Sequence, residues 1–97
     1  MEFKNQSELF NWIWNNRPHV SELTGNDLLP KGHFQWHWQF LHVLCKKNYP
    51  KYRLLPENIL LGLPDEHSHQ ERYEVFNEKK LSLTRAYYKE FYNKEYD

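Results

Sequence analysis

The sequence predicts a small α+β domain, and three observations support this prediction. Apolar residues recur at helical spacing near both ends of the chain, whereas the centre holds alternating and continuous apolar stretches that are typical of strands. Aromatic residues make up 18% of the chain, so large side chains can build a core although the mean hydropathy is −0.99. A length of 97 residues corresponds to a single domain, which we expect to span residues 1–97.

The first helix is predicted over residues 5–16, with the sequence NQSELFNWIWNN. Four large apolar side chains recur within it at helical spacing, namely Leu9, Phe10, Ile13 and Trp14. Ser7 is a suitable N-cap because its hydroxyl can accept a hydrogen bond from a free main-chain amide. The helix should end at Arg17, since a residue that precedes a proline is disfavoured in the helical region.

The clearest strand prediction covers residues 33–44, with the sequence HFQWHWQFLHVL. Aromatic residues alternate with histidine and glutamine in its first part, and an apolar run follows. Trp36 and Trp38 would lie on one face of this strand, where they either belong to the core or stack on bases of a nucleic acid. A loop over residues 45–58 and a short apolar strand or buried extended segment over residues 59–63 complete the centre.

Two helices are predicted after the centre. The first covers residues 64–76, because Pro64 suits the first turn of a helix and two acidic residues follow it near the positive N-terminus. The second, longer helix covers residues 78–92, where large side chains recur between lysine and glutamate residues. The predicted domain therefore has a strand-containing centre flanked by an N-terminal helix and a long C-terminal helix.

The chain has no net charge, but its charges are unevenly distributed. Residues 28–56 contain five basic residues and no acidic residue, which gives this segment a charge of +5, against −2 before it and −3 after it. The five basic residues are Lys31, Lys46, Lys47, Lys51 and Arg53. Such a segment either binds the phosphate backbone of a nucleic acid or is a solvated loop.

Composition also indicates in which cellular compartment the protein is expected. No apolar run approaches the roughly 20 residues that a membrane helix requires, and the N-terminus shows no signal-peptide pattern. Cys45 is the only cysteine, so no disulfide can form within the chain and a four-cysteine zinc site is excluded. We therefore expect a cytoplasmic protein that makes no contact with a membrane.

Three polar residues in the centre have the order and spacing of a known family. Fifteen residues separate His42 from Asn58, and eight separate Asn58 from His67. With the surrounding sequence FLHVLCKKNYPKYRLLPENILLGLPDEH, this pattern resembles the HNH endonucleases, and in particular a branch that is often encoded by phages. The resemblance covers about residues 21–70 and implies the ββα-metal fold.

The resemblance implies a metal-dependent DNA endonuclease or nickase that hydrolyses phosphodiester bonds. By this match, His42 is the general base that activates water, a role that suits an imidazole because its pKa lies near neutral pH. Asn58 holds the base and its loop in position, and His67 is a ligand of one divalent ion, which is Mg²⁺, Mn²⁺ or Zn²⁺. The basic residues expected to contact DNA are Lys46, Lys47, Lys51 and Arg53.

The chain also departs from the family pattern at several positions. Leu41 stands where many members have a metal-binding aspartate or histidine. Four other positions carry zinc-binding cysteines in many members, and here they hold Ser21, Thr24, Leu63 and Glu66. A second ligand could come from Glu71, four residues after His67 on one predicted helix face, or from His37 in the predicted strand. A glutamate at this spacing from a histidine is also an ordinary surface pair.

Each site residue has an ordinary structural interpretation as well. His42 alone would be a core histidine, Asn58 a turn residue and His67 a histidine on a helix surface. A second function therefore remains open, in which the chain keeps the nuclease fold without catalysis and binds a protein or a nucleic acid. If the phage association applies, such a protein would be an inhibitor of host defence in the host cytoplasm.

Overall fold

The computed structural model describes residues 2–93 and confirms an α+β domain. Its α-helices and strands are α1 (Gln6–Asn16), β1 (Phe40–His42), β2 (Ile59–Leu61), α2 (Pro64–His67) and α3 (Glu74–Tyr92). The short 3₁₀ helices between them are Trp36–Gln39, Pro50–Tyr52, Pro56–Asn58 and Gln70–Arg72. In this part of the chain, no helix is long and apolar enough to cross a membrane.

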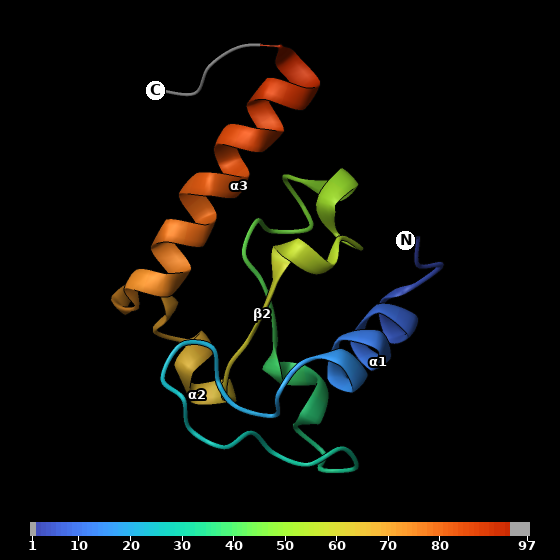
Figure 1. Cartoon of the computed structure of the whole chain (residues 1–97), viewed down its shortest axis with the longest axis vertical. Helices are drawn as coiled ribbons and strands as arrows, with labels where there is room; N and C mark the ends of the chain where they lie inside the picture. The colour runs from blue at the N-terminus through green and yellow to red at the C-terminus, as the bar shows by residue number, and fades with distance from the viewer. Residues whose placement is uncertain (1, 94–97) are drawn as a thin grey trace.

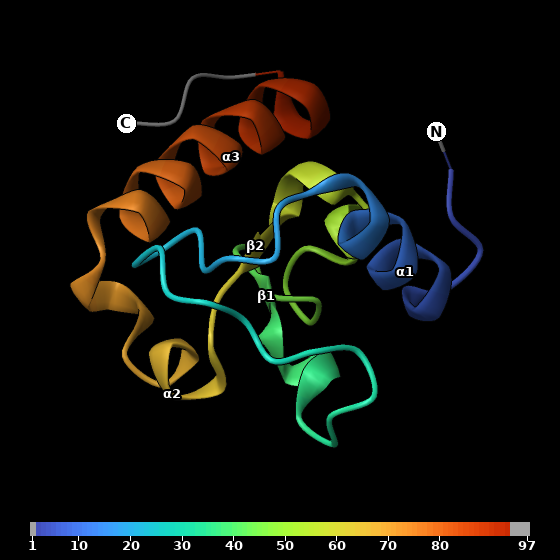
Figure 2. The ribbon, with the colours of Figure 1, turned by 60° about the horizontal axis from the view of Figure 1, so that its bottom comes forward.

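β1 and β2 form a two-stranded antiparallel sheet at the centre of the molecule (Figures 1 and 2). In its register, His42 pairs with Ile59 and Phe40 pairs with Leu61. α1 lies on one side of the strands and α3 on the other (Figure 2), so both faces of the sheet are covered. Because side chains alternate along a strand, Phe40 faces α1 whereas Leu41 faces α3.

Two apolar clusters hold these layers together. The cluster between α1 and the sheet contains Leu9, Phe10, Ile13, Trp14, Phe40, Ile59 and Leu61. The cluster between the sheet and α3 contains Leu41, Val43, Leu44, Tyr52, Leu60, Phe76 and Leu83. Phe10 and Phe40 stack with ring centroids 4.1 Å apart, and this contact holds α1 against the sheet next to His42.

α1 confirms the helix predicted near the N-terminus, but its N-cap differs from the prediction. The side chain of Asn5, and not that of Ser7, accepts a hydrogen bond at 2.9 Å from the main-chain N–H three residues later. At the other end, the Arg17 guanidinium donates hydrogen bonds to the main-chain carbonyls of Pro56 and Ile59, at 2.8 and 2.7 Å. Arg17 thereby ties the end of α1 to the start of β2.

The long strand predicted over residues 33–44 is wrong, because β1 begins only at Phe40. The chain from Trp36 to Gln39 forms a 3₁₀ helix instead. The Gln39 side chain is fully buried, and it is bonded to the main-chain N–H and carbonyl of Leu29 at 2.6 and 3.1 Å. An alternating pattern assigns this side chain to the solvent-facing side of a strand, whereas here it anchors the preceding loop.

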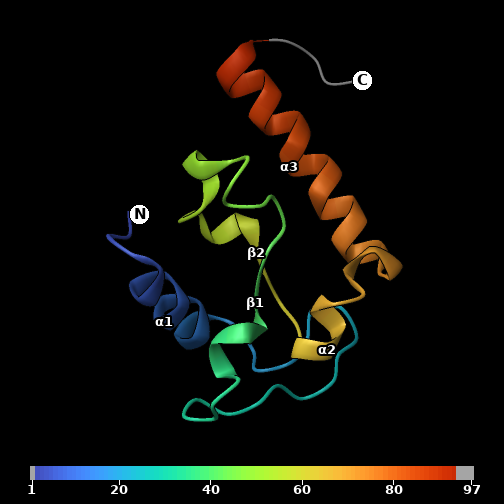
Figure 3. The same ribbon diagram turned by 180° about the vertical axis from the view of Figure 1, so that it is seen from behind.

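The helix predicted over residues 64–76 is also wrong, because α2 ends at His67 and forms a short turn at the foot of α3 (Figure 3). The Ser68 hydroxyl donates a hydrogen bond at 2.7 Å to the main-chain carbonyl three residues earlier, and a 3₁₀ helix follows. Tyr73 then has an extended backbone. The last helix begins at Glu74, four residues before its predicted start, and ends where the sequence predicts.

Candidate functional site

A pocket of about 440 Å³ brings together residues from β1, α2 and the loop after β1. His42 at the end of β1, His67 at the end of α2 and Lys46 in the loop all line it. His37 and Trp38 from the 3₁₀ helix before β1 line its wall as well. None of the described residues that line this pocket is acidic, and Lys46 is positively charged. The pocket therefore attracts an anion more strongly than a free cation.

A hydrogen bond to the main chain orients His42. Its Nε2 lies 2.9 Å from the carbonyl oxygen of Arg53. Because a carbonyl only accepts, this contact requires a proton on Nε2 and leaves an electron pair on Nδ1 of the neutral ring. Burial holds the pKa of His42 below 6.5, with the Arg53 carbonyl acting against this shift and Lys46 adding to it. The ring is therefore neutral near pH 7, and its Nδ1 can accept a proton.

The Nε2 atom of His67 is buried, and no described residue forms a hydrogen bond with it. Burial also lowers the pKa of His67, although the main-chain carbonyl of Gln39 and the charge of Glu66 act against this shift. The ring is therefore neutral near pH 7, which is the form that binds metals. An unpaired buried nitrogen costs about 1–3 kcal/mol, and at the wall of this pocket a water molecule or another group from outside the chain would recover that cost.

Asn58 is fully buried and holds the two ends of the loop after β1 together. Its side-chain oxygen accepts a hydrogen bond from the N–H of Leu44 at 2.7 Å. Its amide nitrogen donates to the carbonyls of Leu44 and Tyr52, at 3.0 and 3.2 Å. The main-chain carbonyl of Asn58 also accepts from Val43, the residue after His42, at 2.9 Å. Asn58 thus fixes the backbone that immediately follows His42.

The structure offers little protein ligation for a metal ion. Leu41 belongs to the cluster that faces α3, so it lies on the opposite face of β1 from the His42 side chain. Across residues 2–93, no group of three or more histidine, cysteine, aspartate or glutamate side chains could hold a metal ion. The unpaired Nε2 of His67 fits one ligand position. Among the described residues, the donors at the pocket would therefore leave most positions around an ion to ligands from outside the chain.

Glu71 lies apart from this pocket. The prediction placed it on one helix face with His67, but α2 ends at His67 and Glu71 belongs to the next 3₁₀ helix. Its side chain is exposed, and Glu71 is not among the residues that line the pocket. His37 is the candidate second ligand that does line the pocket.

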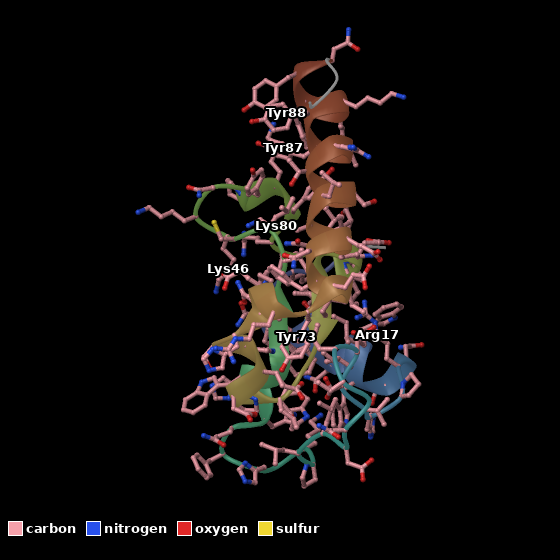
Figure 4. The ribbon with its side chains drawn as sticks, turned by 90° about the vertical axis from the view of Figure 1, so that its left-hand side faces the viewer. Arg17, Lys46, Tyr73, Lys80, Tyr87 and Tyr88 are labelled. Atoms are coloured by element: carbon pink, nitrogen blue, oxygen red, sulfur yellow. The ribbon has the colours of Figure 1, made fainter. Side chains whose placement is uncertain are left out.

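Of the four basic residues predicted to contact DNA, Lys46 lines the pocket. Its ammonium group lies 3.2 Å from the side-chain oxygen of Gln6, on the face of the molecule opposite Arg17 (Figure 4). The Lys51 ammonium group lies 4.3 Å from the ring centroid of Phe91 on α3, and Lys51 lines a separate hollow. The other two, Lys47 and Arg53, are exposed outside the lining of the pocket.

The four positions at which the resemblance predicts missing zinc-binding cysteines meet around the buried carboxylate of one of them, Glu66. Glu66 accepts hydrogen bonds from the Ser21 hydroxyl at 2.5 Å, the Thr24 hydroxyl at 2.6 Å and the Leu63 N–H at 2.9 Å. Burial acts to raise the pKa of Glu66, but these hydrogen bonds outweigh burial and hold the pKa below its usual 4.5. The carboxylate therefore joins the loop at residues 21–24 to α2 without a metal.

The sequence did not predict that α1 contributes to the wall of the pocket. Phe10 was predicted only as core, yet its ring centroid lies 6.2 Å from that of His42 and its side chain lines the pocket. Gln6 and Trp38 complete this wall. Trp38 was predicted either to belong to the core or to stack on bases, and the structure places it outside the core at this wall.

Comparisons with known proteins find no matching family model, no matching curated protein and no matching solved structure. The relationship to HNH endonucleases therefore stays a prediction, which rests on the residues quoted above from the sequence.

Proposed function

We propose that this protein is a metal-dependent DNA endonuclease or nickase of the HNH type, which hydrolyses phosphodiester bonds. The observation that carries the proposal is the meeting of His42 and His67 at one pocket that also contains Lys46. The chain order β1, β2, α2 also supports a ββα-metal centre, with His42 ending the first strand and His67 ending the helix.

His42 would act as the general base. A water molecule that attacks phosphorus must lose a proton, and the free Nδ1 of a neutral imidazole can accept it. The hydrogen bond from Nε2 to the Arg53 carbonyl fixes the ring, and Asn58 fixes the backbone after it. Lys46 would attract the phosphate and helps to keep His42 neutral. This arrangement gives each group a separate task in one hydrolytic step.

His67 would hold the divalent ion, together with water, the substrate and His37 where it reaches. When bound, the ion stabilises negative charge on the phosphate and on the leaving oxygen. An imidazole ligand favours Mn²⁺ or Zn²⁺ over Mg²⁺, which prefers oxygen. Because the described residues supply few ligands, we expect weak binding of the ion in the absence of DNA.

The test is nicking of supercoiled plasmid in the presence of Mg²⁺, Mn²⁺ or Zn²⁺. Replacing His42 with alanine should slow nicking by about 10²- to 10⁴-fold, the usual contribution of a general base. His69→Ala is the matched control, because His69 is an exposed histidine outside the pocket lining and should leave the rate unchanged. Equal nicking by the wild type and His42→Ala would contradict the proposal.

The pH dependence provides a second readout of the same base. His42 has a lowered pKa, so its neutral form persists to lower pH than that of an ordinary histidine. We expect kcat/KM to rise with pH along an acid limb whose midpoint lies below pH 6.5. An acid limb that extends well above this value would exclude His42 as the base.

One observation favours a second function, namely a nuclease-like protein without catalysis that binds a protein or a nucleic acid. Leu41 supplies no ligand, and residues 2–93 contain no side-chain group that could hold a metal by itself. Absence of plasmid nicking with every metal, together with no heat of Mn²⁺ or Zn²⁺ binding in calorimetry, would support this function over the first. An inhibitor of host defence would belong to this second class.

A further inference from the structure

Two large aromatic side chains stand in solvent beside the pocket. Phe34 is 74% exposed and Trp38 is 50% exposed. Their rings contact each other edge to face, with centroids 6.5 Å apart, and His37 packs against Trp38 at 5.4 Å. Large exposed aromatic groups that contact one another leave apolar surface in water, and such surface commonly marks a binding site.

Trp36 and Trp38 provide an internal comparison, since the sequence assigned both to one face of a strand. Trp36 packs edge to face against Trp14 and Phe40, at 5.6 and 4.9 Å, and so belongs to the core that faces α1. Trp38 lies outside that core and lines the pocket instead. The 3₁₀ helix separates the two indoles, so burial of the core does not explain the position of Trp38.

The polar groups at the pocket indicate the chemistry of a partner. Lys46 carries a positive charge there, the imidazoles of His37, His42 and His67 add hydrogen-bonding nitrogens, and the described lining contains no carboxylate. A phosphate group suits such a wall. A nucleotide of a nucleic-acid strand carries both a phosphate, which suits the pocket, and a flat aromatic base, which suits Trp38.

We propose that Phe34, His37 and Trp38 form a stacking platform for unpaired bases, so that the pocket takes single-stranded DNA in preference to duplex. In a duplex the flat faces of bases are covered by their neighbours, whereas an unpaired base offers its face to an aromatic side chain. This proposal rests on the proposed function only in taking the pocket as the site of the phosphate. It assigns a substrate class: single strands, flaps and other unpaired segments.

The experiment measures binding apart from cleavage. His42→Ala protein is titrated, with fluorescence anisotropy detection, into a labelled DNA strand of about 15 nucleotides, a length within the range of known single-strand sites. The duplex of the same sequence is titrated in parallel. We expect the single strand to bind at least about ten-fold more tightly, and Trp38→Ala to remove most of that difference, because one stacked base contributes about ten-fold or more.

Two further variants separate stacking from general damage. Trp38→Phe keeps an aromatic face and should retain most of the preference for the single strand. Tyr92→Ala removes an aromatic side chain of similar exposure from the far end of α3, and it should leave binding unchanged. Equal affinity for both DNA forms, or full affinity in Trp38→Ala, would overturn the proposal.

The cleavage and binding experiments together distinguish an error in the stacking platform from an error in the proposed nuclease activity. If wild-type protein nicks plasmid but binds duplex as well as single strand, the nuclease stands and the platform is wrong. If no metal supports cleavage, yet single strands bind through Trp38, the platform stands and the protein is a single-strand binder without catalysis.

Discussion

Glu66 and His67 are neighbours on α2, yet their polar atoms have opposite surroundings. The Glu66 carboxylate accepts three hydrogen bonds shorter than 3.0 Å and joins two segments of the chain. The Nε2 of His67 is buried at the pocket wall, and no described residue is bonded to it. One side chain is therefore satisfied by the fold, whereas the other has a ring nitrogen without a partner among residues 2–93.

This difference separates a structural task from a chemical one within a single turn of helix. Buried polar groups are normally paired, because an unpaired group costs the free energy of its lost hydration. A fold tolerates such a cost more readily where a ligand recovers it on binding. Stability should thus depend on Glu66, and activity should depend on His67.

Between these two neighbours, the larger expected effect is on activity, from His67→Ala. We expect plasmid nicking to fall by about 100-fold or more. In the proposed function, His67 binds the divalent ion that stabilises negative charge on the phosphate, and alanine cannot bind this ion. The midpoint of urea unfolding should also fall, because the alanine loses the hydrogen bond of the imidazole to the main-chain carbonyl of Gln39, although Nε2 itself has no hydrogen bond to lose among residues 2–93. Full activity in His67→Ala would remove His67 from the site.

The next effect is on stability, from Glu66→Gln. The amide group of glutamine turns one acceptor oxygen into a donor, so a hydroxyl or the Leu63 N–H loses its partner. We expect the free energy of unfolding to fall by about 1–3 kcal/mol, measured by urea denaturation. Glu71→Gln is the matched control: this glutamate is exposed, and its substitution should change stability by less than about 0.5 kcal/mol.

The pH dependence of stability sharpens this test. The pKa of Glu66 in the folded protein lies below its usual 4.5, so the contribution to stability is present above about pH 4.5. It is lost as the pH falls through the folded pKa, because the carboxylate must then be protonated. The difference between wild type and Glu66→Gln should therefore be largest near neutral pH and should shrink in acid. A difference that does not depend on pH would mean that Glu66 does not act as a carboxylate.

The fold was predictable where one apolar pattern decided the structure. The four apolar residues of α1 recur at helical spacing and all are buried against the sheet. Prediction failed where one polar residue overrode the pattern. Gln39 looks solvent-facing in an alternating sequence, but its bonds to Leu29 draw it into the interior and leave a 3₁₀ helix before β1. Such a bond joins residues ten positions apart, and no local pattern reports it.

The grouping of His42 with His67 was predictable from their spacing, whereas the grouping of Glu71 with His67 rested on an assumed continuous helix. The spacing of His42, Asn58 and His67 selected two residues that meet at a pocket and one that fixes the backbone between them. Glu71 was placed beside His67 by assuming an unbroken helix, which ends at His67. Glu66 was noted as a missing cysteine and as an acidic residue near a helix N-terminus, but its partners at residues 21–24 are brought to it by the tertiary fold.

The smallest expected effect concerns Lys46, the lysine at the same pocket as His67. Lys46→Ala should weaken DNA binding only a few-fold and lower the slope of log affinity against log salt by about 1, as expected for one lost phosphate contact. Lys47→Ala is the matched control, because this neighbouring lysine is exposed outside the pocket lining and should have less effect. Both slopes come from anisotropy titrations at several salt concentrations.

Lys46 also has an effect on His42 that Lys47 lacks. Its charge is one of the causes that lower the pKa of His42, so Lys46→Ala should move the acid limb of kcat/KM to higher pH. Lys47→Ala should leave that limb in place. If the two variants shift the acid limb equally, Lys46 affects His42 no more than an exposed lysine of the same loop does. The position of Lys46 at the pocket wall would then have no effect on the pKa of His42.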